Sequence, residues 1–566
     1  TNEEILAHFF GENFEIGLLQ QVTLGEKFLE GTMSGAFNYH QTPGDVVANG
    51  LLRLDDIDLK GANVDSLIFS IDIINERLDA RGNIFWDSTL GVTGWANVPF
   101  VVNKEELDKE FYNRPVRGGL DIQPTDLSRF ENVLKELGII NSGGIALLKG
   151  VMSGKAGAPK FYGVVEVDDP KLSGVPVDQL TATFDYSDEE KKLILKGEIF
   201  EQNTSVAQLD IAYPLDYDFR TFDLYLPNEE DQLSIIIETN SLDIALFNDF
   251  VNPAYIRSMS GEINADLEFI GPMGSIKPSG NFNLRNGTFT SPYSGIDLQN
   301  LIMQIGVDDG ILDVSQIYAE SGNGNLMATG NGVLSGITPK NLLLDVVAKN
   351  FKLIDKPEVT VDVDLDATLS GDLEQPHLIG DLVVNDGYYI VENFGDQALE
   401  EIELTDEPIK YFVPFDSLSL DMTVEFNDQF YVQSFDYLDL ELQPFGLLDL
   451  KKERNNDNEL FGELSIGEGF IRPLGKQFDV ASGTIAFRGA HNDPELTIKS
   501  SYTPQTRQKG ESVELFYSIL GTHLNPDFLF ESTPEMEQSN VICYTLFNKP
   551  CYSLDNWQSV FVEDSE

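Results

Sequence analysis

The chain has 566 residues, of which 94 are acidic and 37 are basic, so its formal net charge is −57. This charge excludes a general nucleic-acid binder, because phosphate groups are bound by surfaces rich in Lys and Arg, and it argues against adsorption to anionic lipid head groups. The hydrophobic fraction of 42% is too high for a disordered acidic protein. Since salt screens the repulsion within such an acidic surface, we expect a marine or halophilic source.

Neither end of the chain carries a recognisable targeting segment. The sequence begins with Thr1 and contains no signal peptide and no run of about 18 apolar residues. We therefore expect an interior fragment of a longer protein. The two cysteines, Cys543 and Cys551, exclude a disulfide-built scaffold and a zinc pattern. A local disulfide and two unpaired thiols both remain open at this point.

Helices are predicted at three places only. Residues 103–112 favour a short helix with two glutamates in its first turn. Residues 125–138 favour a longer one, with Thr125 or Asp126 as the N-cap and Gly138 at the end. Near the C-terminus, Thr533 is expected as an N-cap with Pro534 at the first helical position. These helices are interpreted as insertions or ends in a β architecture.

The dominant pattern is alternation of apolar and polar residues with a period of two, which predicts strands that have one apolar and one acidic face. The pattern is clearest at residues 263–269, 359–369, 418–426 and 438–442. The apolar positions that we assign to an inward face are Ile263, Ala265, Leu267, Phe269, Val359, Val361, Val363, Leu365, Leu418, Leu420, Met422, Val424 and Phe426.

Four dipeptides are typical of tight β-hairpin turns, and they predict a largely antiparallel sheet. They are Asn286-Gly287, Asp309-Gly310, Asn331-Gly332 and Asp386-Gly387.

A weak internal repeat accompanies the strands. The glycines at 271, 280 and 287 are spaced like those at 371, 380 and 387, and a third copy begins at Gly154. Each repeat predicts a strand, a Gly/Pro turn and a second strand, and such a unit cannot bury its apolar face alone. Stacked units must therefore curl, either completely into a packed solenoid or partly into an open gutter. The large candidate inward residues, Phe478 among them, favour the gutter.

Several segments resemble the TamB family, and in particular its C-terminal region, also called the DUF490 domain. The segment 260–289 (SGEINADLEFIGPMGSIKPSGNFNLRNGTF) is similar to a recurrent unit of that family, and residues 462–502 and 531–550 resemble its final blocks. Weaker similarity covers residues 126–163. Asn548 stands where relatives commonly have glycine, and relatives continue beyond the segment at which this chain stops.

The resemblance implies an all-β fold in which an elongated sheet is folded lengthwise around a hydrophobic groove (a β-taco, or open solenoid-like gutter), with few short helices. We divide the chain into N-terminal β repeats (1–100), β repeats with short helical insertions (101–240) and a TamB-like C-terminal region (241–566). The resemblance also implies a parent protein anchored in the inner membrane of a Gram-negative bacterium and crossing the periplasm.

The expected function follows from the same resemblance. Family members are linked to phospholipid transport between the two membranes and to assembly or secretion of outer-membrane proteins. The expected partners are phospholipid, nascent outer-membrane proteins and an Omp85-class barrel (TamA or BamA-like), with no nucleic acid. The alternative is a secreted or surface β-solenoid adhesin or structural protein, which would share the turns, the repeats and the acidity.

No catalytic residues, cofactor or metal site are predicted, so we expect a protein that is not an enzyme. The five histidines, at positions 8, 40, 377, 491 and 523, are scattered and form no helical metal-binding pair. The acidic series Asp362, Asp364 and Asp366 is interpreted as a solvated strand face, since carboxylates on alternate strand positions are too far apart for one cation.

Overall fold

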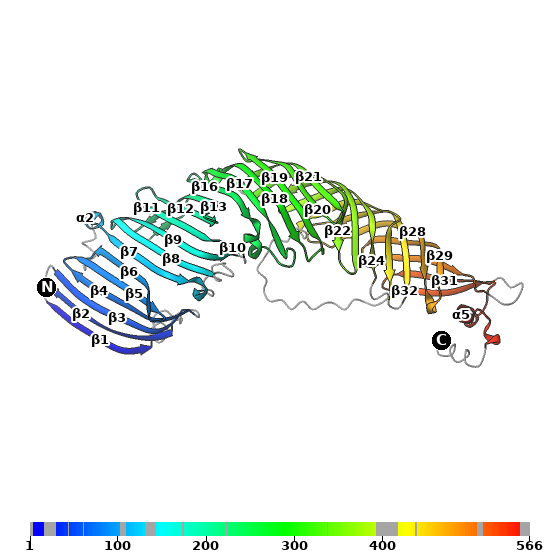
Figure 1. The fold of residues 1–566 in the computed structure, drawn as a ribbon, viewed down its shortest axis with the longest axis horizontal. Coiled ribbons are helices and arrows are strands. Elements are labelled where there is room, and N and C mark those ends of the chain that lie inside the picture. The colour runs from blue at the N-terminus through cyan, green and yellow to red at the C-terminus, as the bar shows by residue number, and fades with distance from the viewer. Residues whose placement is uncertain are drawn as a thin grey trace.

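The computed structural model describes residues 4–15, 30–42, 45–59, 62–101, 109–130, 143–172, 175–220, 223–336, 338–391, 417–435, 438–505 and 513–554. Within these residues, 30 strands form one continuous sheet, which extends as a long arch with the N- and C-termini at opposite ends (Figure 1). This architecture confirms the predicted all-β fold with few short helices.

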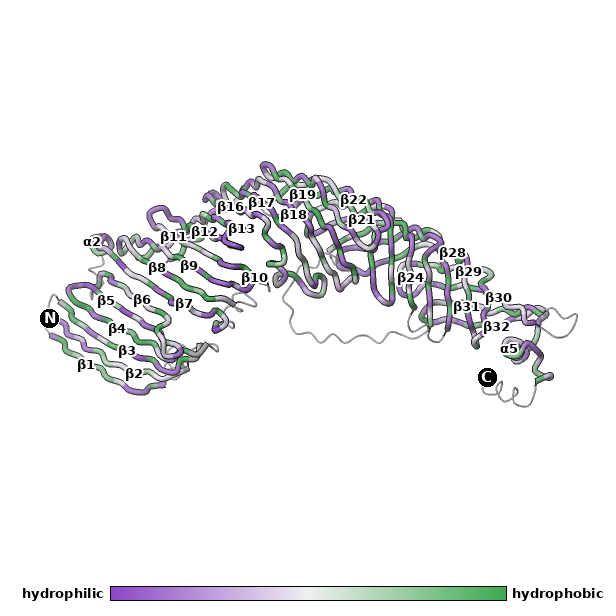
Figure 2. Tube along the Cα trace, in the orientation of Figure 1, coloured by the Kyte–Doolittle hydropathy of each residue, from purple (hydrophilic) through white to green (hydrophobic). Residues whose placement is uncertain are grey.

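Residues alternate along the strands as period-two patterning requires, and apolar and polar positions follow one another on nearly every strand (Figure 2). The strands of the first half are β1 (Ile5–Glu15), β2 (Glu30–Thr42), β3 (Asp45–Leu59), β4 (Ala62–Ile74), β5 (Arg77–Trp86), β6 (Thr89–Pro99), β7 (Arg117–Asp126), β8 (Gly143–Lys155), β9 (Ala158–Leu172), β10 (Val175–Pro176), β11 (Gln179–Ser187), β12 (Lys192–Glu201), β13 (Thr204–Pro214) and β16 (Gln232–Asp243).

The second half continues the same sheet. Its strands are β17 (Ser258–Pro272), β18 (Lys277–Thr290), β19 (Asp297–Asp308), β20 (Ile311–Ser321), β21 (Gly324–Ser335), β22 (Thr338–Asp355), β23 (Val359–Asp372), β24 (Gln375–Ile390), β25 (Ser419–Phe426), β26 (Phe430–Ser434), β27 (Leu440–Lys452), β28 (Glu459–Ile471), β29 (Phe478–Ala490), β30 (Glu495–Tyr502), β31 (Glu514–Thr522) and β32 (Pro526–Thr533). Two further strands, β14 (Asp216–Asp218) and β15 (Asp223–Tyr225), form a separate small hairpin.

Neighbouring strands are antiparallel almost throughout, which confirms the prediction for the sheet as a whole. The exception is β24, which pairs in parallel with both β25 and β26. Strand β27 then pairs with both β25 and β26, so these two short strands together fill one position in the sheet.

The three repeat copies occupy the same structural position. Gly154, Gly271 and Gly371 are each the last residue but one of their strands, and each has a positive φ (99°, 144° and 100°). Each of these strands is followed by an antiparallel partner. The three glycines therefore mark three connections between paired strands, as the repeat predicted.

Of the four dipeptides predicted to form hairpin turns, only Asp309-Gly310 does so, between β19 and β20. The prediction was wrong for Asn286-Gly287, Asn331-Gly332 and Asp386-Gly387, which lie inside β18, β21 and β24. The strands are longer than the sequence suggested, and two of these dipeptides accompany register shifts rather than turns. Asn286, with a φ of 51°, adopts the left-handed conformation inside a paired strand.

Bulges gather near one side of the sheet. Gly261 near the start of β17, Asn286 near the end of β18 and Asn300 near the start of β19 all have positive φ angles and coincide with register shifts. Because these strands are antiparallel, the start of β17, the end of β18 and the start of β19 lie on the same side of the sheet, along the line of the strand ends. Because a bulge bends its strand, an aligned series of bulges folds the sheet lengthwise along one line.

The helices are fewer and shorter than expected. Part of the segment 103–112 lies outside the described residues, and α2 occupies Lys109–Asn113. The prediction of an α-helix from Thr125 was wrong at its start, because Thr125 and Asp126 end β7 and a 3-10 turn follows at Leu127–Phe130. Asp126 still caps this turn by accepting a hydrogen bond from the Ser128 backbone N–H (2.9 Å). Residues 131–138 lie outside the described residues.

The C-terminal helix was placed four residues too early. Thr533 ends β32, and α5 runs from Gln538 to Phe547 with Glu537 at the N-cap. The remaining short elements are 3-10 turns, η3 (Ile244–Phe250), η4 (Met273–Ser275), η5 (Pro473–Gly475) and η6 (Cys551–Ser553). Cys543 and Cys551 form a disulfide that links α5 to η6, which decides between the two states left open by the sequence.

Candidate hydrophobic groove

One face of the sheet, here called the inner face, carries an uninterrupted apolar row across the N-terminal half. Strand pairing places Phe9 opposite Phe37, Phe37 opposite Gly50 and Gly50 opposite Ile71. The row then continues through Ala80, Ala96, Gly118, Met152, Phe161, Tyr186 and Leu193. Polar side chains are absent from this row except for the hydroxyl of Tyr186, so the inner face of β1 to β12 is suited to apolar ligands.

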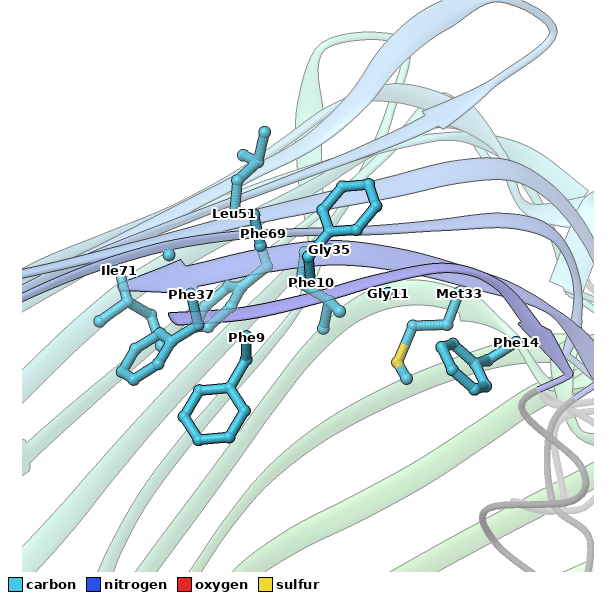
Figure 3. A pocket seen from close by; sticks show the side chains of 13 residues that line it. Phe9, Phe10, Gly11, Phe14, Met33, Gly35, Phe37, Leu51, Phe69 and Ile71 are labelled. Carbon is cyan, nitrogen blue, oxygen red and sulfur yellow. The ribbon is translucent and has the colours of Figure 1, made fainter. Parts of the chain in front are cut away.

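The row opens into a hollow of about 400 Å³ over β1 to β4. Phe9, Phe14, Met33 and Phe37 point to its side of the sheet, whereas Phe10 and Leu51 point to the other (Figure 3). Phe9 is 64% exposed and Phe14 is 54% exposed. The complete lining is Phe9, Phe10, Gly11, Phe14, Met33, Gly35, Ala36, Phe37, Gly50, Leu51, Leu52, Phe69 and Ile71. Large side chains of this kind are buried in most soluble proteins, so this exposed apolar surface is the candidate binding site.

The site residues predicted on β17 lie in a partly covered region of the inner face. Ile263 and Ala265 are buried, while Leu267 and Phe269 are half-buried. The first three pack with Leu242, Leu246 and Leu284 in one cluster, and η3 supplies Leu246 to it. Here a 3-10 turn covers part of the apolar face.

The site residues predicted on β23 and β25 are brought together although they are far apart in sequence. Strand β24 lies between the two, and its Leu382 pairs with Leu365 on one side and with Val424 on the other. Met422 and Val424 are buried, and Val361, Leu365, Leu420 and Phe426 pack against them. On β23, Val363 is also buried, and Val359 pairs with Tyr389 of β24. Leu418 precedes β25, and its carbonyl accepts a hydrogen bond from Lys452 Nζ (3.0 Å).

The C-terminal end of the sheet is packed, which corrects the expectation of an open gutter there. Phe478, taken as a sign of the gutter, is fully buried. It belongs to a cluster of buried residues on β27 to β31 that also includes Leu515 and Ile519, and Val541 and Tyr544 of α5 complete that cluster. Sequence reasoning missed this core because single-strand alternation does not reveal what lies opposite. It also missed the hollow at Phe9, Phe14 and Phe37, for which the only signal was the density of phenylalanine near the N-terminus.

The acidic face is less uniformly solvated than expected. One carboxylate oxygen of Asp362 is buried without a hydrogen-bond partner, and burial raises the pKa of this group. Asp364 instead accepts hydrogen bonds from the Asn350 backbone N–H and from the Asn385 side-chain amide, both at 2.7 Å. These two bonds tie β22, β23 and β24 together on the face opposite Val363.

The polar side chains that could act in chemistry are dispersed. His8 contacts Asn38 Oδ1 (2.7 Å), His40 contacts Glu4 Oε1 (2.7 Å) and His491 contacts the Asn458 carbonyl (3.0 Å). Within the described ranges, no three His, Cys, Asp or Glu side chains come together in a way that could hold a metal ion. In the same part of the chain, none of the helices is both long enough and apolar enough to cross a membrane.

The chain is similar to known proteins. Residues 315–562 match the family model of the TamB C-terminal domain. A curated relative, the translocation and assembly module subunit TamB of Haemophilus influenzae, is 26% identical over 113 residues. That match covers 20% of this chain and 9% of the relative, so the chain corresponds to a small part of the relative's length. Both findings confirm the resemblance to the TamB family.

Proposed function

Because residues 315–562 match the family model of the TamB C-terminal domain, we propose that this protein lines a hydrophobic path across the periplasm of a Gram-negative bacterium. The path carries phospholipid between the inner and outer membranes, serves the assembly or secretion of outer-membrane proteins, or does both. The observation that carries the proposal is the apolar inner row from Phe9 to Leu193 with its open hollow.

The physics of such a surface suits transport. Each methylene group removed from water contributes about 0.8 kcal/mol, so an acyl chain is held by its length rather than by specific contacts. Non-directional binding of this kind lets a chain slide between equivalent positions on the inner face. The inner residues of the proposal are those lining residues of the hollow that point to its side of the sheet, such as Phe9, Phe14, Met33 and Phe37, together with the predicted positions on β17, β23 and β25.

A sheet edge supports the protein-assembly part of the proposal. Among the described residues, β32 pairs only with β31. An exposed edge can accept an additional strand through backbone hydrogen bonds, as a nascent outer-membrane strand would require. An Omp85-class barrel (TamA or BamA-like) is the proposed partner, and neither part of the proposal involves catalysis by this chain.

The alternative of a secreted adhesin predicts a packed interior throughout. The hollow at β1 to β4 favours the transport reading over that alternative, because Phe9 and Phe14 are mostly exposed there. An inner-membrane anchor in the parent protein, the marine or halophilic source and the three-part division at residues 100 and 240 stay predictions. Strand β16 spans the second of these boundaries.

The test is native mass spectrometry with lipid extraction on the purified chain. The inner-face variant carries Leu52→Arg and Phe69→Arg, which are register partners, and the control carries Ile68→Arg and Asn83→Arg, register partners on the outer face that do not line the hollow. Both variants place two like charges opposite each other on neighbouring strands, so they share that destabilising effect. Leu365 and Val424 are less suitable, because Val424 is almost completely buried and a charge there threatens folding.

The proposal expects phospholipid to co-purify with the wild type and with the outer-face control, and to be depleted from the inner-face variant. A folded wild type without lipid would refute the lipid part of the proposal. Equal lipid loss in both folded variants would refute the assignment of the inner face.

A further inference from the structure

A second apolar cavity lies at the other end of the sheet, between β24 and the packed C-terminal core. Its volume is about 130 Å³. It is lined by Tyr389, Val391, Val432, Leu440, Leu442, Ile485, Phe487, His491, Asn492, Pro494, Leu496, Ile498 and His523. The apolar members come from β24, β26, β27, β29 and β30, from Val391 after β24 and from Pro494 before β30.

This cavity continues the inner face that carries the predicted groove residues. Val359 pairs with Tyr389, Tyr389 with Val432, and Val432 with Leu442. The cavity is therefore reached along one apolar row from β23, with no polar side chain in that row apart from the hydroxyl of Tyr389.

Beyond the cavity the inner face is closed. Leu440, Leu442 and Ile498 line the cavity and also belong to the C-terminal core. Phe478 and Ile519 in that core have no exposed surface, and Val541 of α5 is 1% exposed. Side chains thus fill the interior between β27 and β31, and an apolar ligand cannot pass through to the end of the sheet.

The mouth of the cavity is polar. His491 and Asn492, from the connection between β29 and β30, are exposed. His523, which follows β31, is half-buried with both ring nitrogens buried, so it lies deeper than these two residues. The Nδ1 atom of His491 lies 3.0 Å from the Asn458 carbonyl, which holds the ring at the rim. An apolar interior with a polar rim fits an amphiphile that inserts its apolar end first.

We infer that this cavity is the closed end of the groove and that it receives the methyl end of a phospholipid acyl chain, so that the lipid leaves sideways and not through the C-terminal end. The inference rests on the proposed function and names the last binding position within it. The cavity volume of about 130 Å³ limits the size of the ligand that can enter. For comparison, a dry apolar cavity of about 150 Å³ accommodates a molecule the size of benzene. Only the last few carbons can therefore enter, and the rest of the lipid lies toward Tyr389.

The test uses vesicles of phosphatidylethanolamine that contain a phosphatidylethanolamine with a diazirine at the methyl end of one acyl chain. After illumination of the full chain, labelled residues are identified by peptide mass spectrometry. The expected labels fall on Val432, Phe487 and Ile498 and on residues of the N-terminal hollow. A probe with the diazirine on the head group is expected to leave Val432 and Ile498 unlabelled.

Two variants and a control make the assignment specific. Val432→Trp fills the cavity and is expected to lower labelling of residues 485–498 by about tenfold, the effect of losing roughly two buried methylene groups. Phe487→Ala enlarges the cavity and is expected to raise labelling of Ile498, so the inference does not depend on one variant folding. Thr497→Trp, on the exposed outer face of the same strand, is expected to change nothing.

Labelling of the hollow without labelling of the cavity would overturn this inference and leave the proposed function standing. Cavity labelling that is unchanged in a folded Val432→Trp variant would also overturn it. Labelling at neither place in a folded chain would overturn this inference and the lipid part of the proposed function.

Discussion

Gly50 lies opposite Phe37 in the register of β3 and β2, and the Phe37 ring takes the space that a side chain at Gly50 would need. A methyl group at Gly50 would come within 2.6 Å of Phe37 Cδ2. Because such a contact is too short, the glycine allows the aromatic ring to lie across the floor of the hollow. The same inner face holds Gly82, where the nearest atom to an added methyl would be Phe69 Cδ2 at 3.6 Å.

The first prediction compares these two glycines. Gly82→Ala is expected to stabilise the sheet locally by roughly 0.5–1 kcal/mol, because alanine loses less conformational freedom than glycine. Gly50→Ala is expected to destabilise it by about 1 kcal/mol, since the Phe37 ring must move. Native-state hydrogen exchange of the amides in β2 to β5 measures both effects. Equal changes in the two variants would show that the ring does not depend on Gly50.

The second prediction contrasts the two ends of the molecule. Leu515→Ala removes a fully buried side chain from the C-terminal core and is expected to cost about 2–5 kcal/mol. Phe10→Ala removes a larger side chain that is 76% exposed and is expected to cost about 0.5 kcal/mol or less. Urea unfolding followed by hydrogen exchange in each region measures the two costs. A larger cost at Phe10 would contradict the difference in packing described here.

The third prediction concerns the disulfide between Cys543 and Cys551. The two residues are eight positions apart, and closing a loop of this length stabilises the local structure by about 2–3 kcal/mol. Reduction with dithiothreitol is therefore expected to speed hydrogen exchange in α5 and to leave β27 and β28 unchanged. In a Cys551→Ser variant, dithiothreitol should have no further effect. Unchanged exchange in α5 after complete reduction of the wild type would refute the prediction.

The fourth prediction follows from the raised pKa of Asp362. Burial is the main cause; Asp386 on β24 and Asp355 add to it, while Lys352 on β22 opposes it. Because the folded-state pKa of this acid is above its unfolded value, ionisation destabilises the fold. The loss of stability begins as the pH rises above the usual aspartate range near about 4 and is complete above the raised pKa.

Asp362→Asn is therefore expected to stabilise the protein at neutral pH and to have little effect at a pH below the usual aspartate range. Thermal unfolding at the two pH values measures this difference. The matched control is Asp364→Asn, on the same strand face, which is expected to destabilise at neutral pH because it weakens two charge-assisted hydrogen bonds, from Asn350 and Asn385. Stabilisation by both substitutions would point to general relief of negative charge instead.

Local patterning was enough to predict the strands and their faces. Val363 and Leu365 share the inner face because side chains on a strand alternate between two sides, and this rule needs no knowledge of the neighbours. Gly154, Gly271 and Gly371 located strand connections for a similarly local reason, since their positive φ angles strongly favour glycine.

Asn286-Gly287 shows where local patterning was insufficient. The same dipeptide suits a tight turn or a bulge, because both require a positive φ, and the choice depends on whether the strand goes on pairing beyond it.

The sequence by itself therefore determined the strands, their two faces and several of their connections, while the tertiary structure decided where the inner face is open and where it is sealed. Phe9 and Phe478 are both phenylalanines on an inner strand face, yet the first is 64% exposed and the second has no exposed surface. The rings of Tyr502, Tyr517 and Phe530 surround Phe478, whereas Phe9 has the Phe37 ring beside it and the hollow in front. Burial depends on which side chains the folded chain places around a residue, and around Phe478 these come from β30, β31, β32 and α5, outside its own strand.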